Sequence, residues 1–571
     1  MIAGLLLVSI ALFFVAYRVY GRWISARFGL DDRRLVPSEA MRDGIDFVPT
    51  PAPVVLGHHF SSIAGAGPVV GPILAGLFFG WVPAVLWIVL GSIFVGGVHD
   101  IAALVGSIRH RARSVAELAR QYMSPIAFKL CLAFIWLALV YVVVAFADLT
   151  AATFMDAEFN GGGVAMSSGL FIVLALTFGL VARRSELPVW ATTAIFLPLV
   201  ALAIWAGDVT TIPDGVVPAL FGSERNTWNF LLLVYALIAS VTPVWILLQP
   251  RDYLSSYLLY FAVIGGAAGI LIGGLTGAFS AGWPAVVTPA MVREVGSMPL
   301  GPLFPILFIT VACGACSGFH SIVASGTTAK QLRCETDARR VGYGAMLIEG
   351  LVAVVALACV MLLPWSGDAL RMQPLQVFAA GMGTFLSRLG IPAEVGAHFG
   401  LLALSTFLLT TLDTCTRLGR YVFQEFFELD NTKASVRWLA TFATLALPAI
   451  LLSITLTDAA GNPVPAWRAI WPVFGATNQL LAGLALLTAT VWLKRTGRSY
   501  VFVAAPMVFM VATTMTALWM LVGDHGVTLV GVIAAFLFLL GCLLIVEAVR
   551  ALRAGPVEPE PVVLRTAIAA D

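Results

Sequence analysis

Charged residues are scarce in this sequence. Only 11% of the 571 residues are Asp, Glu, Lys or Arg, whereas a soluble globular chain carries about 25%. Hydrophobic residues make up 60% of the chain, and the mean hydropathy is +0.95. A water-soluble surface cannot be assembled from this composition, so we predict an all-α polytopic membrane protein surrounded by the lipid bilayer. The net charge of +2 is too small to indicate nucleic acid as a partner.

Cysteine and metal-binding patterns are also sparse. The seven cysteines are spread through the chain, and the one C-x-x-C, at Cys313 and Cys316, lies among small residues that favour close helix packing. No H-E-x-x-H motif occurs, and the adjacent His58 and His59 would point about 100° apart on a helix. We therefore predict no metal site, no cofactor and no enzymatic activity. No large soluble domain interrupts the apolar segments, which disfavours a receptor or a kinase.

Apolar runs predict about fifteen transmembrane helices. Their centres lie near residues 10, 67, 94, 140, 174, 197, 238, 266, 315, 353, 406, 447, 480, 510 and 538. If the N-terminus is outside, 28 of the 33 Lys and Arg residues fall on the cytoplasmic side. The outer side keeps only Arg225, Arg293, Arg371, Arg388 and Arg468. The positive-inside rule therefore predicts a multi-pass protein with an external N-terminus and a cytoplasmic C-terminus.

The predicted second span cannot be one continuous helix. It contains GHHFSSIAGAGPVVGP, from Gly57 to Pro72, in which prolines remove backbone donors and glycines allow unwinding. Unwound backbone at membrane depth survives only beside protein or a wet cavity, and the half-helix that follows points its positive end into that cavity. We expect an anionic substrate group to bind there; a packing kink is the alternative. The predicted substrate-binding residues at this break are Gly65, Ala66, Gly67, Pro68, Val69, Val70 and Gly71.

A second break is predicted in the seventh span, at Ser240 to Val244, with Thr242 and Pro243 facing the first break across the substrate. Broken helices in corresponding positions of two antiparallel five-helix halves indicate an inverted-repeat transporter of the LeuT type. The predicted organisation is a first helix and loop over 1–53, a ten-helix core over 54–420 with repeats at about 54–206 and 227–420, accessory helices over 421–553, and a cytoplasmic tail over 554–571.

Hydroxyl groups share one face of the ninth span. Ser317, Ser321, Ser325 and Thr328 are spaced four, four and three residues apart. We identify Ser321, Ser325 and Thr328 as a candidate cation site, which would suit sodium. The alternative is that these hydroxyls bond to backbone carbonyls, as Ser and Thr commonly do in membrane helices.

Ionisable side chains inside spans are costly and usually mark transport pathways. The candidates for proton coupling or gating are His58, His59, His99, Asp100, Asp148 and His320. Histidine beside a carboxylate suits a proton-coupled carrier. The alternative for the histidines near the interface and for Asp100 is hydrogen bonding to loop backbone. Asp148 has no cation nearby in sequence, so it is expected either to carry a proton or to be hydrated at the outer interface.

Seven further polar residues have narrower predicted roles. We predict that Asp413 pairs with Arg417 one turn on, and that Glu349 is a lone candidate for coupling. Arg251 and Asp252 are expected to pair across a gate. Asn478 and Gln479 are predicted to join helices.

Several long blocks resemble one family. They are GHHFSSIAGAGPVVGP, GSIFVGGVHD (Gly91 to Asp100), PVWILLQPRDYLSSY (Pro243 to Tyr257), GACSGFHSIVASGTTAKQL (Gly314 to Leu332), LDTCTRLGRY (Leu412 to Tyr421) and IWPVFGATNQLLAGLAL (Ile470 to Leu486). In this order they are similar to the carbon starvation protein A (CstA) family. The resemblance implies a transporter of the bacterial inner membrane, related to the LeuT-fold superfamily, that takes up pyruvate, with protons, or short peptides during carbon starvation.

The expected function is therefore secondary active import of pyruvate or a short peptide by alternating access. A sodium-coupled carrier of another small organic solute is the alternative. A channel and a membrane-embedded metalloenzyme are the rival classes. The sequence leaves open the choice between pyruvate and peptides, between proton and sodium, and between monomer and oligomer.

Overall fold

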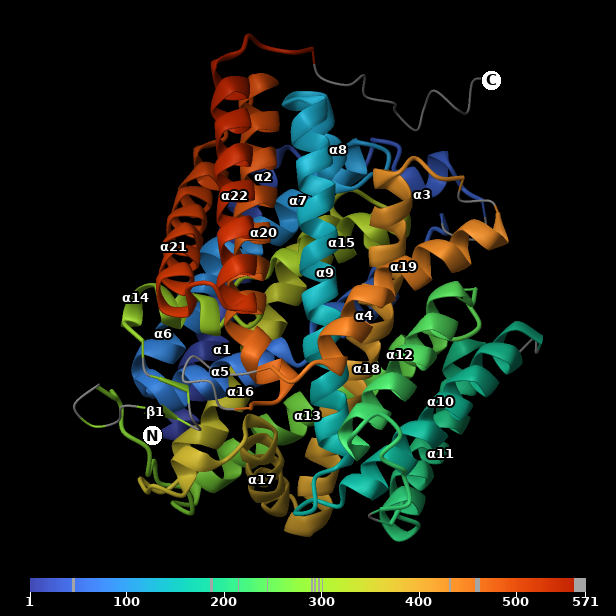
Figure 1. The fold of residues 1–571 in the computed structure, drawn as a ribbon, viewed down its shortest axis with the longest axis vertical. Helices are drawn as coiled ribbons and strands as arrows, with labels where there is room; N and C mark the ends of the chain where they lie inside the picture. The colour runs from blue at the N-terminus through green and yellow to red at the C-terminus, as the bar shows by residue number, and fades with distance from the viewer. Residues whose placement is uncertain are drawn as a thin grey trace.

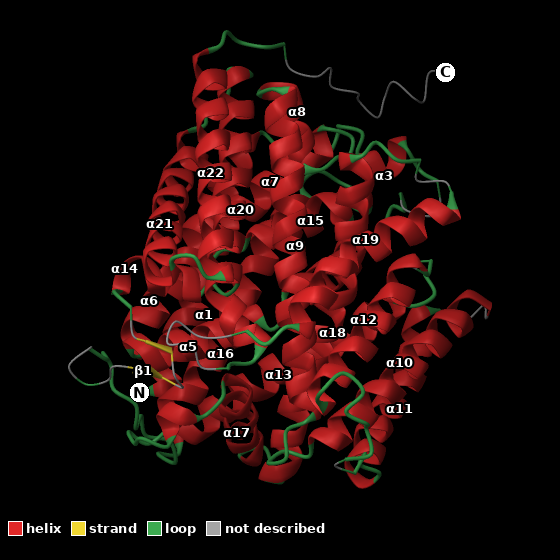
Figure 2. Ribbon diagram, viewed as in Figure 1, coloured by secondary structure: helices red, strands yellow, loops and turns green. Residues whose placement is uncertain are grey.

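The computed structural model describes residues 1–43, 47–184, 188–213, 215–243, 245–288, 291, 294–295, 298–299, 301–430, 433–456 and 463–558. Figures 1 and 2 show that these residues form a bundle of helices joined by short loops. Helices α20 and α22 end at the top of Figure 1, on the side of the C-terminus, and Arg495 and Arg553 lie at these helix ends. We call this side of the molecule the basic end. Most of the predicted tail lies outside the described residues.

The elements follow one another along the chain in three groups. The first comprises α1 (Ile2–Arg18), α2 (Tyr20–Phe28), α3 (Pro37–Ala40), α4 (Ala52–Ile63), α5 (Gly67–Phe79), α6 (Trp81–Gly91), η1 (Ser92–Gly96), α7 (Gly97–Arg109), α8 (Val115–Tyr122) and α9 (Pro125–Phe154). The second comprises α10 (Gly161–Arg184), α11 (Val189–Val209), α12 (Glu224–Val241), α13 (Leu248–Leu275), β1 (Glu294–Val295), β2 (Met298–Pro299), α14 (Leu303–Thr310), α15 (Gly318–Gly326) and η2 (Thr328–Lys330). The third comprises η3 (Arg339–Tyr343), α16 (Gly344–Leu362), η4 (Ala369–Arg371), α17 (Pro374–Ser387), α18 (Ala393–Phe426), α19 (Ala434–Ser453), α20 (Ala466–Arg495), α21 (Val501–His525) and α22 (Leu529–Arg553).

Length and composition identify 12 helical segments among the described residues that can each cross a membrane, and the bent pair α4–α5 makes a thirteenth. The prediction of about fifteen spans is therefore higher than this count. The two remaining predicted spans, centred near residues 238 and 315, correspond to α12 and to the broken pair α14–α15. The all-α polytopic fold is confirmed.

The predicted break in the second span is confirmed. Helix α4 ends at Ile63, α5 begins at Gly67, and the two axes are bent by 49°. Pro68 lies in the first turn of α5, where a proline costs no helical hydrogen bond because the first amide groups of a helix have no partner within it. Every residue of α5 is buried, so this half-helix lies inside the protein.

The second broken span is not where the sequence predicted it. Thr242 is the residue before a proline and adopts an extended conformation (φ −65°, ψ 139°), which ends α12. The predicted break is therefore a turn between α12 and α13, and Pro243 is exposed at it; Val244 lies outside the described residues. The second broken span is instead α14–α15, interrupted between Thr310 and Gly318.

The two broken spans cross each other in antiparallel fashion. Helix α4 contacts α15, and α5 contacts α14, so the first half of each span packs on the second half of the other. Gly71 lies directly against the carbonyl of Thr310. Two carbonyls of the interrupted backbone in the second break accept hydrogen bonds from side chains. Trp87 Nε1 donates to Val311 O at 3.2 Å, and Ser92 Oγ donates to Gly314 O at 3.2 Å. These bonds satisfy backbone that would otherwise be costly inside a membrane.

Other helices of the two halves of the chain also pack against each other in pairs. Helices α9 and α18 pack together, as do α12 and α19, while α13 covers α4 and α20 covers α15. A π-helical turn marks the helix that follows each broken span, η1 beside α7 and η3 beside α16. The division into repeats, predicted at 54–206 and 227–420, stays a prediction. A division at 52–275 and 303–495 would place one broken span at the start of each repeat.

Candidate functional site

A small pocket lies where the two breaks meet. It is narrow, with a volume of about 10 Å³, the space of one water molecule. Its lining residues are Ile63, Gly65, Gly67, Val142, Phe146, Cys313, Phe319, Thr411 and Phe474. A Cβ atom on Gly65 would lie 2.5 Å from Thr411 Oγ1, and one on Gly67 would overlap the side chain of Cys313. The two glycines therefore allow the backbone of the first break to approach α18 and the second break closely.

The first break supplies fewer free donors than the sequence suggested. The amides of Val69 and Val70 both donate to Ala66 O, at 3.1 and 2.8 Å, so they are used within the first turn of α5. Of the seven predicted substrate-binding residues at this break, Gly65 and Gly67 line the pocket and Gly71 packs against the second break. Thr242 and Pro243, predicted opposite them, lie instead at the α12–α13 turn.

Two adjacent residues of α20 hold both halves of the second break. Asn478 Oδ1 accepts the amide of Phe319 at 3.0 Å, in the first turn of α15, and Asn478 Nδ2 donates to Ser317 Oγ at 3.1 Å. Gln479 Nε2 donates to Phe308 O on α14 at 2.9 Å. The predicted role of Asn478 and Gln479 in joining helices agrees with these contacts. Asn478 also lines a second narrow pocket, of about 10 Å³, that shares Val142, Phe319 and Phe474 with the first.

A chain of ionisable groups lies beside the second break, and we call it the His320 network. His320 Nδ1 is 2.8 Å from Asp100 Oδ2, and His320 Nε2 is 3.1 Å from Glu349 Oε2. His99 Nδ1 lies 2.7 Å from Asp100 Oδ1. The four side chains come from α7, α15 and α16, and each is at most 1% exposed. The sequence singled out His99, Asp100 and His320, but it did not reveal that Glu349 is the second partner of His320.

Charge counting shows what the His320 network can do. One imidazolium between two carboxylates carries a net charge of −1, and one additional proton makes it neutral. Isolated charges in a low-dielectric interior cost several kcal/mol each, so a buried group of this kind favours a proton or a compensating cation. Among the described residues, Glu349 Oε1 and His99 Nε2 have no hydrogen-bond partner, and both are buried. The network can therefore bind and release a proton.

A second buried cluster surrounds Arg251 at the start of α13. Its guanidinium bonds to Asp413, and Tyr235 donates to Asp413 Oδ2 at 2.8 Å. Arg251 Nη2 also lies 3.5 Å from Asp252 Oδ1, the pair that the sequence predicted, and His58 Nδ1 lies 3.5 Å from Asp252 Oδ2. The cluster joins α4, α12, α13 and α18.

The predicted ion pair between Asp413 and Arg417 is wrong. Arg417 Nη2 donates instead to the carbonyls of Ala239 and Thr242, at 2.7 and 2.6 Å. These carbonyls stand at the end of α12, where the last turn of a helix has no internal donors. Asp413 is thereby left to Arg251, 162 residues away in sequence.

The remaining predicted coupling residues have other partners. His59 Nδ1 lies 2.8 Å from Thr328 Oγ1, which connects α4 to η2. Asp148 is not isolated: its carboxylate accepts from Arg225 Nε at 2.6 Å and from the amide of Trp467 at 2.9 Å. These bonds connect α9, α12 and α20, so a role for Asp148 as a lone proton carrier does not fit the structure.

Two of the hydroxyl groups that share one face of the ninth span bond to backbone carbonyls. Ser321 Oγ donates to Gly318 O at 2.6 Å, and Ser325 Oγ donates to Ser321 O at 2.8 Å. These two hydroxyls donate to carbonyls of their own helix, as the alternative expected, and the candidate cation site at Ser321, Ser325 and Thr328 stays a prediction. Among the described residues, no three His, Cys, Asp or Glu side chains have the geometry of a metal site.

Comparison with known proteins gives a consistent result. Residues 2–373 and 366–517 match the family described as Carbon starvation protein CstA. The chain is 32% identical to the Peptide transporter CstA of Escherichia coli K12, over 90% of this chain and 80% of that protein. It is 31% identical to the Pyruvate/proton symporter BtsT of the same organism (90% and 79%) and to the Peptide transporter CstA of Bacillus subtilis (96% and 96%).

Solved structures are more distant. The crystal structure of the Eremococcus coleocola manganese transporter, in complex with an aromatic bis-isothiourea compound, aligns with a TM-score of 0.46 at 12% identity. That alignment covers 90% of this chain and 99% of the transporter. MhsT in complex with L-phenylalanine aligns with a TM-score of 0.43 at 12% identity, over 87% and 98%.

Proposed function

Because the chain belongs to the carbon starvation protein CstA family, we propose that it is a secondary active transporter that imports a small carboxylate of the pyruvate class together with protons. Alternating access would expose the pocket between the two breaks first to one side of the membrane and then to the other. The observation that carries the proposal is the position of His320. It lies on α15, the half-helix whose Phe319 lines the pocket, and it stands between the buried carboxylates of Asp100 on α7 and Glu349 on α16.

The narrow pocket supports a small solute. At about 10 Å³ it holds no more than one water molecule, so the two broken spans must move apart to admit a substrate. Curated relatives are named for peptides and for pyruvate, and the smaller of the two needs the smaller movement. Thr411, Asn478 and the helix N-terminus at Gly67 are the polar groups near a bound carboxylate.

Proton coupling fits the chemistry of the site better than sodium coupling. The hydroxyls of Ser321 and Ser325 are engaged by carbonyls, whereas the His320 network carries an unbalanced negative charge. A proton symporter is present among the curated relatives. In the proposed cycle, the proton taken up by the network balances the negative charge that the substrate carboxylate brings, so the loaded site carries no more charge than the empty one when α15 reorients.

The proposed orientation places the basic end in the cytoplasm of a bacterium and the N-terminus outside, as the distribution of 28 of the 33 Lys and Arg residues predicts. With this orientation α15 and α4 lie toward the cytoplasm, and α5 and α14 lie toward the outside. Import would then require the α4 and α15 halves to move apart at the basic end.

Substrate choice is tested by competition. In proteoliposomes with an inward proton gradient, labelled pyruvate is expected to accumulate, and unlabelled pyruvate is expected to compete with it. Di- and tripeptides at the same concentration are expected to leave the uptake unchanged, because the site is proposed to open only far enough for a short carboxylate. Competition by peptides but not by short carboxylates would contradict the proposed substrate class, and the same assay with a sodium gradient alone serves as the control for the coupling ion.

A further inference from the structure

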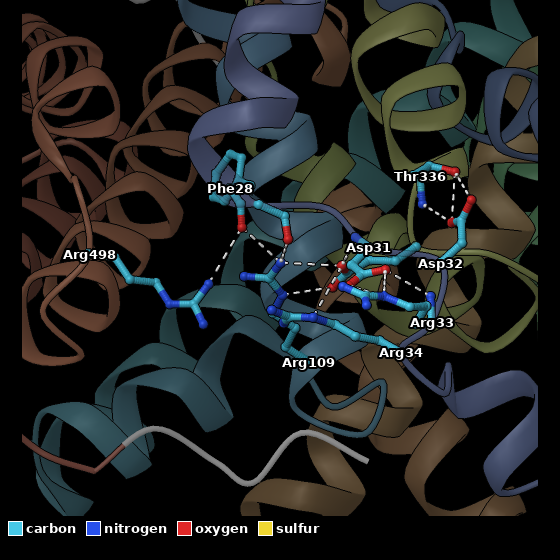
Figure 3. Close-up of polar contacts among 10 residues, drawn as sticks. Phe28, Asp31, Asp32, Arg33, Arg34, Arg109, Thr336 and Arg498 are labelled. Carbon is cyan, nitrogen blue, oxygen red and sulfur yellow. Dashed lines mark hydrogen bonds and ion pairs between the residues drawn. The ribbon is translucent and has the colours of Figure 1, made fainter. Parts of the chain in front are cut away.

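Three arginines from distant parts of the chain converge at the basic end (Figure 3). Arg109, at the end of α7, donates through Nη2 to Phe28 O at 2.8 Å and to Gly29 O at 3.1 Å. Arg498, in the loop between α20 and α21, donates through Nη1 to the same Phe28 carbonyl at 3.5 Å. Two guanidinium groups thus share one carbonyl oxygen.

Arg34 completes the group, and one carboxylate lies among the three. Glu335 accepts from Arg109 Nε at 2.7 Å, and Arg34 Nε lies 3.7 Å from its other oxygen. The side chain of Glu335 is 1% exposed. Its Oε2 also accepts the amide of Asp31 at 2.8 Å, so this carboxylate already has several donors.

The neighbouring acidic side chains, Asp31 and Asp32, bond to residues other than these three arginines. Asp31 accepts four hydrogen bonds from the guanidinium group and the amide nitrogen of Arg33, at 2.8–3.1 Å. The side-chain bonds are the largest cause that lowers the pKa of Asp31 to about 2. Asp32 accepts the amide and the hydroxyl of Thr336, at 3.0 and 2.8 Å. In the described part of the chain, three guanidinium groups therefore share a single buried carboxylate.

This excess of positive charge is unfavourable without an anion. Burial lowers the pKa of Arg34 and of Arg498, and the charge of Arg109 lowers both further. Arg109 is only 9% exposed, and its buried Nη1 atom has no hydrogen-bond partner in the part of the chain that the structure describes. A buried donor of a charged group that has no acceptor is costly, so an acceptor from outside the chain would be favourable here.

We propose that Arg34, Arg109 and Arg498 form a binding site for a phosphate-class oxyanion at the basic end. Guanidinium groups donate parallel hydrogen bonds to phosphate oxygens, and three of them suit a tetrahedral anion better than a single carboxylate does. Clusters of arginine between transmembrane helices at the cytoplasmic surface are sites for anionic lipid headgroups. The same chemistry serves the phosphodiester of a phospholipid and free inorganic phosphate.

The bound anion would connect elements that no backbone segment joins directly. Arg34 belongs to the segment between α2 and α3, Arg109 to α7, and Arg498 to the α20–α21 loop. Glu335 lies in the loop that leads from η2 to η3. Because a ligand that binds only the folded state stabilises it, occupancy is expected to raise the midpoint of thermal unfolding.

The test uses the full-length protein, purified in a neutral detergent and stripped of lipid. Two probes separate the two sources: inorganic phosphate against chloride at matched ionic strength, and short-chain phosphatidylglycerol against short-chain phosphatidylcholine. We expect phosphatidylglycerol to raise the unfolding midpoint by several degrees. Stabilisation by phosphate as well identifies a site for the free anion, and stabilisation by phosphatidylglycerol alone identifies a headgroup site; both support the proposal.

Substitutions test whether the stabilising probe binds at these arginines. Arg498→Gln and Arg34→Gln are each expected to weaken binding of the stabilising probe about tenfold, the equivalent of one lost charge-assisted hydrogen bond. Arg111→Gln, an exposed arginine two residues after Arg109, is the matched control and is expected to bind normally. The proposal is overturned if neither probe stabilises the wild-type protein, or if all three variants bind as the wild type does. The wild-type titration needs no variant to fold.

Discussion

Replacement of His320 by glutamine is expected to reduce uphill, proton-driven uptake by at least about 100-fold. Removing one partner of a buried ion pair costs about 3–5 kcal/mol, and 1.4 kcal/mol corresponds to a factor of ten. Without the imidazole, Asp100 and Glu349 lose the group that lies 2.8 and 3.1 Å from them. The protonation step that balances the substrate charge is then lost. The measurement is uptake of labelled pyruvate into proteoliposomes with an imposed pH gradient.

Two companion variants separate coupling from folding. Glu349→Gln retains the contact between His320 and Asp100, so it is expected to fold, to exchange substrate across the membrane and to lose the dependence of uptake on external pH. His525→Gln, at the far end of α21, is the control and is expected to transport normally. Uphill uptake by His320→Gln within twofold of the wild-type rate would contradict the role assigned to the network.

Substitution of Gly67 by alanine is expected to reduce transport about tenfold or more. A Cβ atom at this position would overlap both the Cβ and the Sγ of Cys313, and overpacking of this kind costs about 1–3 kcal/mol. Because the two residues stand on the two breaks, the clash would force the broken spans apart and displace the pocket lining. The measurement is substrate exchange in proteoliposomes, which requires no proton gradient.

A second substitution on the other break tests whether the contact is the cause. Cys313→Gly removes both clashing atoms, so the double variant Gly67→Ala with Cys313→Gly is expected to regain most of the exchange activity. Gly169→Ala on α10, where nothing lies within 4 Å of the added methyl group, is the control for a harmless glycine substitution. If the double variant is as inactive as Gly67→Ala, the proposed approach of the two breaks is wrong.

The first broken span was predictable because its cause is local. Two prolines and four glycines within Gly57 to Pro72 prevent a continuous helix whatever surrounds them. The second break has no proline between Thr310 and Gly318, and it is held by Trp87, Ser92 and Asn478, which are remote in sequence. A helix whose interruption depends on such partners gives no local signal. Thr242 and Pro243 do mark the end of a helix, α12. From the sequence, this helix end was interpreted as a break in the middle of a span.

The polar partners were the least predictable part of the site. Spacing along one helix paired Asp413 with Arg417, but helix ends supply carbonyls that compete for a guanidinium group, and α12 supplied them to Arg417. Asp148 and Arg225 are 77 residues apart, and His320 and Asp100 are 220 residues apart. The sequence could identify His320 as unusual because it is ionisable inside a span, but its partners depend on the crossing of α7, α15 and α16.

Simultaneous recording of substrate and proton movement tests directly whether pyruvate and protons cross the membrane together. Proteoliposomes without any imposed gradient would receive pyruvate while a pH-sensitive dye reports the external medium. We expect pyruvate entry to make the medium more alkaline, in a fixed ratio to the substrate taken up. We expect the Glu349→Gln variant to lose the proton signal while pyruvate exchange continues. Pyruvate entry with no proton movement, or entry that follows a sodium gradient instead, would contradict proton-coupled import.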